Sequence, residues 1–197
     1  MAPINQTAVS TLQPKLYNDA NGGPWFSVAV GALEAMKAAC RNDAKEDQQF
    51  LDLGCGSGDV TRDTLLPRCL PCRRVVAVDV SEDMIDYAKT HFGHPKICYD
   101  ILDIVADDMT DFVERYGRFD RVYSFYCFNW LKNQEKAFRN VAELLKPGAE
   151  CLFWFFADSP HIRFRQRLVK MERWKTYAKV RRCKEVNARA FSIIMLN

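Results

Sequence analysis

An apolar stretch that runs directly into three alternating glycines constrains the fold of this chain more than any other feature. Phe50-Leu-Asp-Leu53 is followed by Gly54-Cys-Gly-Ser-Gly58, and a helix-compatible segment comes next. This order is typical of a buried strand that ends in a tight turn and leads into a helix. Because glycine has no Cβ, a ligand can lie against the turn, where the helix presents free N–H groups. The sequence therefore predicts a ligand-binding loop at the carboxyl end of the first strand.

A second apolar segment, Arg74-Val-Val-Ala-Val-Asp79, also reads as a strand that ends in an acidic residue. Asp79 follows the glycines by about twenty residues, which is the separation from which a carboxylate reaches the hydroxyl groups of a ribose. Ser81 is suited to cap a helix over residues 83–92. A surface carboxylate that only caps a turn is the alternative interpretation of Asp79.

Strand-like and helix-like segments alternate along the rest of the chain. A helix is expected over residues 25–40, and Leu65-Leu-Pro67 is expected to end the helix that follows the glycines. Further strands are expected within 96–104, at 118–124 and at 151–156, with helices at 111–116 and 133–145, the last ended by Lys146-Pro-Gly148. This alternation predicts an α/β fold, a doubly wound sheet of about five parallel strands with helices on both faces.

Composition excludes several other classes of protein. The 197 residues fit one domain, and 48% hydrophobic with 27% charged residues is ordinary for a globular chain. No apolar run reaches the length of a membrane span, and the first residues lack the pattern of a signal peptide, so a cytoplasmic location is expected. The cysteines are expected to be reduced. Cys69-Leu-Pro-Cys72 has no second pair of ligands at similar spacing, which favours a surface turn over a metal site.

The spacing of the glycines distinguishes between two kinds of nucleotide cofactor. Dinucleotide binding requires G-x-G-x-x-G, whereas this chain has D-x-G-x-G-x-G from Asp52 to Gly58. That pattern resembles motif I of the class I S-adenosylmethionine (SAM) methyltransferases, which have a Rossmann-like sheet. The resemblance implies that the cofactor is S-adenosyl-L-methionine.

Later segments resemble a narrower family, the arthropod juvenile hormone acid O-methyltransferases and their relatives. The resemblance lies in Phe119-Asp-Arg-Val-Tyr-Ser-Phe-Tyr-Cys-Phe-Asn-Trp130, Ala137-Phe-Arg-Asn140 and Leu144-Leu-Lys-Pro-Gly148, and the similarity runs from about residue 16 to residue 178. Those enzymes transfer a methyl group from SAM to the carboxylate of juvenile hormone acid or farnesoic acid. The resemblance implies the same reaction class, with a small apolar carboxylic acid as substrate.

The same resemblance assigns expected roles to individual residues. It places next to the cofactor Asp52, Gly54, Gly56, Gly58, Asp79, Val80, Met84, Asp103, Ile104, Ser124 and Phe125. On the substrate side it places Tyr17, Trp25, Asn129 and Trp130. Ordinary helix packing is the alternative for Met84, and core filling is the alternative for the aromatic residues. No catalytic acid or base is expected, because the substrate carboxylate is already ionised near neutral pH, and no metal site is expected.

The end of the chain has no counterpart in the family. Residues 1–15 are expected to be loosely ordered, residues 16–179 to form a methyltransferase domain without its late strands, and residues 180–197 to form a divergent basic and apolar tail. The fifth strand would then have an exposed edge suited to self-association. Three functions remain open: an active carboxyl methyltransferase, a truncated pseudoenzyme that binds SAM and acts through a partner, and a binder of nucleic acid or acidic surfaces. The third is the weakest, since the basic tail contains no groove-reading or stacking module.

Overall fold

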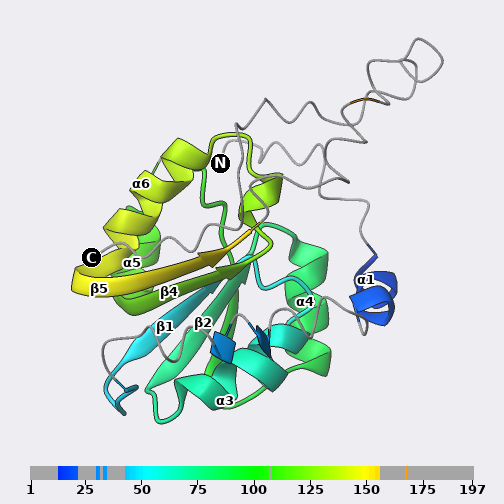
Figure 1. Ribbon diagram of the computed structural model, residues 1–197, viewed down its shortest axis with the longest axis horizontal. Coiled ribbons are helices and arrows are strands. Elements are labelled where there is room, and N and C mark those ends of the chain that lie inside the picture. The colour runs from blue at the N-terminus through cyan, green and yellow to red at the C-terminus, as the bar shows by residue number, and fades with distance from the viewer. Residues whose placement is uncertain are drawn as a thin grey trace.

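The computed structural model describes residues 13–21, 30–31, 33–34, 43–106, 108–155 and 167. Within these residues, five parallel strands form one sheet in the order β3-β2-β1-β4-β5 (Figure 1). The strands are β1 (Gln49–Leu53), β2 (Arg74–Asp79), β3 (Ile97–Ile101), β4 (Phe119–Phe125) and β5 (Leu145–Trp154). The strand order reverses between β1 and β4, as in a doubly wound sheet, so the predicted fold class is confirmed.

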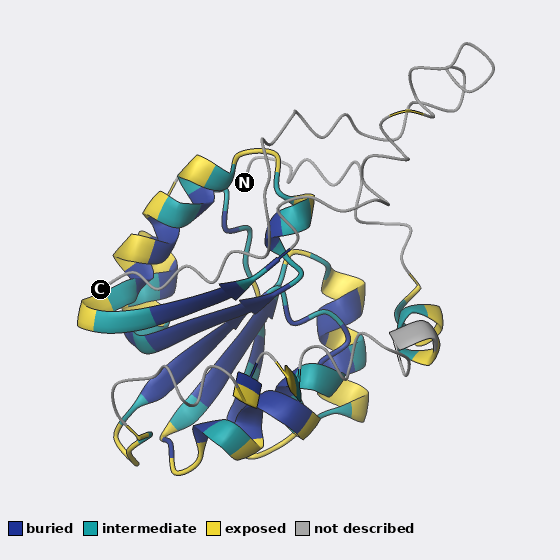
Figure 2. Cartoon of the chain, in the orientation of Figure 1, coloured by how far each residue is buried: buried dark blue, intermediate teal, exposed yellow. Residues whose placement is uncertain are grey.

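Helices cover both faces of the sheet, which explains why its strands are apolar at consecutive positions. The described helices are α1 (Pro14–Asn21), the π-helix η1 (Thr61–Leu65), α3 (Leu66–Cys69), α4 (Glu82–His91), α5 (Thr110–Tyr116), the 3₁₀-helix η2 (Phe128–Trp130) and α6 (Gln134–Leu144). Phe50 packs into one apolar cluster with η1, α3 and α4, whereas Leu51 and Leu53 pack into another with α5 and α6. The strands are accordingly buried and the outer helix faces exposed (Figure 2). None of the described helices is long and apolar enough to cross a bilayer.

The helix after the glycines does not end at Pro67, so that prediction is wrong. It passes through the π-helix η1, in which the N–H of Leu66 donates to the carbonyl of Thr61, and continues as α3 to Cys69. The wider π-turn shifts the hydrogen-bonding register just before the proline. Pro67 consequently lies in the first turn of α3, where a missing N–H removes no helical hydrogen bond.

Strand β5 begins at Leu145, not at Cys151 as expected. Lys146-Pro-Gly148 does follow the end of α6, but these residues already belong to the strand. The pairing with β4 is irregular here, since the six residues from Leu145 to Glu150 stand opposite the three from Phe119 to Arg121. A proline fits in this place because β5, among the described residues, pairs with β4 alone and forms an edge of the sheet.

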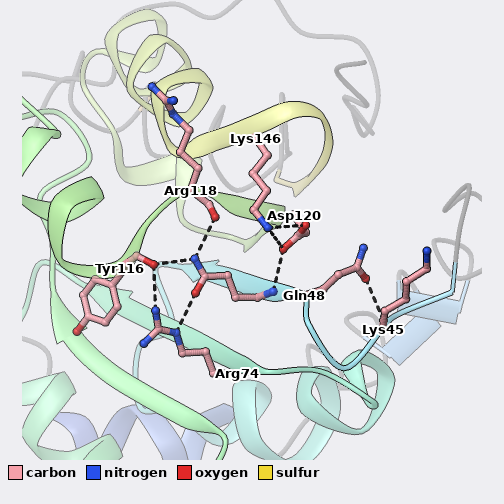
Figure 3. Close-up of polar contacts among 8 residues, drawn as sticks. Lys45, Gln48, Arg74, Tyr116, Arg118, Asp120 and Lys146 are labelled. Atoms are coloured by element: carbon pink, nitrogen blue, oxygen red, sulfur yellow. Dashed lines mark hydrogen bonds and ion pairs between the residues drawn. The ribbon is translucent and has the colours of Figure 1, made fainter.

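A polar network closes the amino ends of the strands, on the side opposite the glycine loop (Figure 3). The buried amide of Gln49 donates to the carbonyls of Tyr116 and Arg118 and accepts from Arg74. The backbone N–H of Gln49 donates to Asp120, which also pairs with Lys146 at 2.8 Å. These bonds connect β1, β2, β4 and β5 at one end, so the other end of the sheet is the one available to a ligand.

Two further expectations differ from the structure. Helix α1 begins at Pro14, in a region where the sequence pattern predicts no helix. The segment from Cys69 to Cys72 is a turn with Leu70 and Pro71 exposed, as expected, but the side chains of Cys69, at the end of α3, and of Cys72 are buried. Both cysteine side chains belong to the apolar cluster on this face of the sheet. Most of the helix expected over residues 25–40, and the tail beyond residue 167, lie outside the described residues.

Candidate cofactor site

The glycine loop, residues 54–58, is hydrogen-bonded to the end of β2. The N–H groups of Gly54 and Cys55 both donate to the carbonyl of Val78, at 2.8 and 2.9 Å. Gly54 has φ +80°, and a Cβ at this position would lie 2.4 Å from the Cβ of Cys127. Glycine is therefore required here for two reasons, the backbone conformation and the close approach of the segment that follows β4.

Asp79 joins the glycine loop directly. Its Oδ2 accepts a hydrogen bond from the N–H of Gly56 at 3.0 Å, and its Oδ1 accepts one from the N–H of Ser81 at 3.0 Å. Burial raises the pKa of this carboxyl, and the backbone hydrogen bonds from Ser81, Gly56 and Val80 oppose the rise. Because each oxygen has a second lone pair, the carboxylate is held in place and can still accept from a ligand.

Asp52 lies beneath the loop and is almost completely buried, with 2% of its surface exposed. The hydroxyl of Thr61, in η1, donates to its Oδ2 at 2.6 Å. Burial raises the pKa of Asp52 to about 7, the Thr61 hydrogen bond opposes the rise, and the charges of Asp79 and Asp59 add to it. The carboxyl groups of Asp52, Asp79 and Asp59 thus lie close together, and a positive charge nearby would stabilise their ionised forms.

Gly58 faces away from this carboxylate pair, toward α4 and β3. A Cβ at Gly58 would lie 2.8 Å from the Cβ of Ala88 and 2.8 Å from the phenol oxygen of Tyr99. That phenol donates to the carbonyls of Gly58 and Phe92. The third glycine therefore allows the helix after the loop to pack closely on its neighbours.

The end of β3 supplies a second wall of the site. The N–H of Leu102 donates to the carbonyl of Asp79 at 3.1 Å, which sets the two strand ends side by side. Asp103 forms a turn in which its Oδ1 accepts from the N–H of Val105 at 3.0 Å, and the next residue, Ile104, is buried. Val80, directly after β2, is 39% exposed. Met84 is buried, and its N–H donates to the Ser81 side chain that caps α4, as the sequence predicted for Ser81.

Strand β4 ends at a segment with an unusual backbone. The buried Ser124 donates from its hydroxyl to the carbonyl of Leu53 at 2.8 Å, and Phe125 is buried beside it. Tyr126 has φ +56°, a left-handed conformation that non-glycine residues rarely adopt and that is concentrated at functional sites. Its N–H donates to the carbonyl of Trp154, and the indole N–H of Trp154 donates to its phenol oxygen at 3.2 Å.

The residues expected on the substrate side are less closely grouped. The ring of Tyr17, on α1, comes within 3.5 Å of the position that a Cβ on Gly56 would occupy, so it lies against the glycine loop. Asn129 and Trp130 are in η2, and Trp130 is 61% exposed. Trp25 lies outside the described residues. Within the described parts of the chain, no cluster of three or more side chains could hold a metal ion.

Four residues around the site were assigned no role from the sequence: Thr61, Tyr126, Cys127 and Asn140. Thr61, Tyr126 and Cys127 carry no sequence signal for their roles, because each role depends on a neighbour from another part of the chain. Asn140 does carry one. It is a polar residue three positions after Ala137 and four before Leu144, on the apolar face of a helix, where only a hydrogen-bonded side chain is normally tolerated.

Comparison with known proteins agrees with this arrangement. The chain is 35% identical over 135 residues to juvenile hormone acid O-methyltransferase from Bombyx mori, a match that covers 68% of the chain and 47% of the relative. It is 36% identical over 140 residues to the protein of the same name from Drosophila melanogaster, covering 70% of the chain and 46% of the relative. The chain thus spans about half the length of these curated relatives.

Solved structures show the same fold. The SAM-bound structure of an amino pentose methyltransferase from Micromonospora echinaspora has a TM-score of 0.52 and 22% identity, covering 72% of this chain and 56% of that one. Residues 51–153, more than half of the 197, match the family described as "Methyltransferase domain". The matched region begins in β1 and ends in β5, so it contains the glycine loop, Asp79 and the loop after β3. The chain belongs to the methyltransferase-domain family.

Proposed function

We propose that this chain binds SAM at the carboxyl ends of β1, β2 and β3 and transfers its methyl group to the carboxylate of a small apolar acid. The observation that carries the proposal is the 3.0 Å hydrogen bond from the Gly56 N–H to Asp79. It joins the glycine loop and the acid of the second strand into one site. The alternative, in which Asp79 only caps a surface turn, does not account for a half-buried carboxyl that is bonded to a loop 23 residues away.

The residues around this point suit an adenosine with a positively charged methionine end. Asp79 would accept from ribose hydroxyls, the backbone of the glycine loop would approach the cofactor closely, and Val80 and Ile104 would contact the adenine. The buried carboxyl of Asp52 would favour a positive charge nearby. When bound, SAM supplies an activated methyl group on a sulfonium.

The reaction needs alignment more than acid–base chemistry. A carboxylate is a competent nucleophile at neutral pH, so no general base is required. Aromatic residues near the end of β4 and in α1, among them Tyr17 and Trp130, would line an apolar binding surface, align the substrate and exclude water. Two relatives named juvenile hormone acid O-methyltransferase, 35% and 36% identical, support an isoprenoid-like acid as the substrate class.

Calorimetric titration of the folded protein with SAM tests the binding part of the proposal. Saturable binding with one site is the expected result. The absence of binding by a folded protein would exclude both the enzyme and a SAM-binding pseudoenzyme. Methyl transfer is tested next with SAM carrying a radiolabelled methyl group and with farnesoic acid or shorter fatty acids as acceptors. Binding of SAM without transfer to any of these acids would favour the pseudoenzyme.

Changing Asp79 to Asn should weaken SAM binding by about 1–3 kcal/mol, roughly 5- to 150-fold, because charge-assisted hydrogen bonds to ribose hydroxyls are replaced by neutral ones. The amide oxygen can still accept from the N–H of Gly56, whereas the amide nitrogen cannot accept from the N–H of Ser81, so one of the two backbone contacts is retained. Titration of the variant measures the loss. The matched control is Asp86→Asn, which removes the same charge from an exposed position on α4. Equal affinity of both variants and the unchanged protein would contradict the role of Asp79.

A further inference from the structure

Asn140 makes two long-range hydrogen bonds from the buried face of α6. Its Nδ2 donates to the carbonyl of Ile104 at 2.8 Å and to the carbonyl of Ala106 at 2.9 Å. Its neighbours on this face, Val141 and Leu144, belong to the apolar core. A side-chain amide buried among apolar groups is tolerated only when it is hydrogen-bonded, and here both amide hydrogens are used.

The two carbonyls that Asn140 holds belong to the loop that follows β3. The loop starts at Leu102, whose N–H is bonded to the carbonyl of Asp79 in β2. It then turns at Asp103, whose backbone carbonyl accepts from Ala106 and whose side chain accepts from Val105, both at 3.0 Å. Asn140 donates to this turn from α6, whereas the bond of Leu102 is made to β2. The orientation of Asp103 and Ile104 is therefore set between β2 on one side and α6 on the other.

We infer that Asn140 is a positioning residue for the adenine end of the cofactor: it holds the Asp103–Ile104 turn in the shape that selects the base, without touching the cofactor itself. This inference rests on the proposed function, in which that turn contacts adenine. The direction of the two bonds supports it. They fix the carbonyls on either side of Val105, so the backbone that carries the Asp103 carboxylate and the buried Ile104 side chain is held just after the carboxyl end of β3.

The substitution Asn140→Leu separates positioning from packing. Leucine has the same branched shape and the same number of non-hydrogen side-chain atoms, although its methyl groups make it bulkier. It leaves the carbonyls of Ile104 and Ala106 without their donor, and the turn is expected to move toward solvent. Val141→Ala is the control, because it creates a cavity on the same buried face of α6 and leaves the loop contacts in place. Asn140→Ser is the second variant, used if the leucine variant does not fold, since serine retains one donor.

The readout is base selectivity, measured as the ratio of dissociation constants for S-adenosylhomocysteine and S-inosylhomocysteine, which carries an oxo group in place of the adenine amino group. The unchanged protein is expected to prefer the adenine compound. Asn140→Leu should lose about tenfold in affinity for it, the equivalent of one well-made hydrogen bond, and the ratio should fall toward one. Val141→Ala should lower the melting temperature and keep the ratio.

Each result decides a different point. An unchanged ratio in Asn140→Leu, or an equal fall in Val141→Ala, would overturn the positioning role. A protein that binds both compounds equally from the start would also overturn it, while leaving SAM binding intact. Failure to bind either compound would instead refute the proposed function. In a double-mutant cycle, Asn140→Leu should add little to the selectivity already lost in Asp103→Ala, since both act through one turn.

Discussion

Replacing Asp52 with Asn is expected to make the protein more stable at pH 8, by about 2–4 kcal/mol, and to flatten its stability between pH 4 and pH 7. The carboxyl is 2% exposed, and burial raises its pKa from the ordinary 3.8 to about 7. A shift of about three pKa units corresponds to roughly 4 kcal/mol of unfolding free energy. Because Asp52 is coupled to other titrating groups, the substitution is expected to restore only part of this free energy. Asparagine removes the ionisable group and can still accept from the Thr61 hydroxyl at the same place.

The sign follows from proton binding in the two states. Below about pH 4 the carboxyl is protonated in both the folded and the unfolded chain. Between about pH 4 and pH 7 the folded state keeps the proton that the unfolded state has released, so the free energy of unfolding falls as pH rises. Above about pH 7 the carboxyl is ionised in both states, and the free energy of unfolding falls no further because of this group. Asp79, Asp59, Cys55, Cys69, Cys127 and Tyr99 are the titratable groups that interact with Asp52. The raised pKa of Asp79 acts in the same direction.

Urea unfolding at pH 5, 6, 7 and 8 measures this difference. The difference in unfolding free energy between Asp52→Asn and the unchanged protein should increase with pH. For the exposed Asp86→Asn control this difference should be small and constant. Parallel profiles for Asp52→Asn and the unchanged protein would mean that the carboxyl ionises normally. A group that weakens the fold at neutral pH is typical of a binding site, and the proposed cationic cofactor would supply the missing charge.

Loss of the Glu150 carboxylate should destabilise the protein by about 3–5 kcal/mol. Glu150 and Arg121 are direct partners across β4 and β5, and their charged atoms, Oε2 and Nε, are 2.9 Å apart. Their side chains are only 15% and 9% exposed, and the guanidinium lies 5.7 Å from the centre of the Phe50 ring. Glu150→Ala therefore removes a carboxylate that lies 2.9 Å from a cation that water reaches poorly.

The destabilisation in Glu150→Ala is expected to come more from the loss of this carboxylate beside the charged Arg121 than from the attraction within the pair itself. The double variant Arg121→Met with Glu150→Leu should be close to the unchanged protein in stability, or above it, because both charges of the pair are removed together. Glu135→Ala breaks the exposed pair with Arg139 and should cost less than about 0.5 kcal/mol. Urea unfolding of the three variants tests this order. A loss below about 1 kcal/mol for Glu150→Ala would show that the buried pair contributes no more than the surface one.

Local sequence patterns were sufficient for most of the sheet. Continuous apolar runs located β1, β2 and β4 within a residue or two, because a strand covered on both faces must be apolar at consecutive positions. Helix α4 followed from its cap at Ser81, and α6 followed from the period of its apolar residues. The failures share a cause. The passage of the helix through Pro67 depends on a π-turn, and the early start of β5 depends on irregular pairing with β4. Neither feature has a local signature.

The sequence by itself determined the elements of the site: a strand that ends in glycines, an acid at the end of the next strand, and the family to which both belong. Only the tertiary structure decided how they meet. The bond from Gly56 to Asp79, the contact between Thr61 and Asp52, and the hold of Asn140 on the loop after β3 each join residues that are 9 to 36 positions apart. Such contacts depend on strand register and on which helix face packs where, and these are properties of the whole sheet that no single segment encodes.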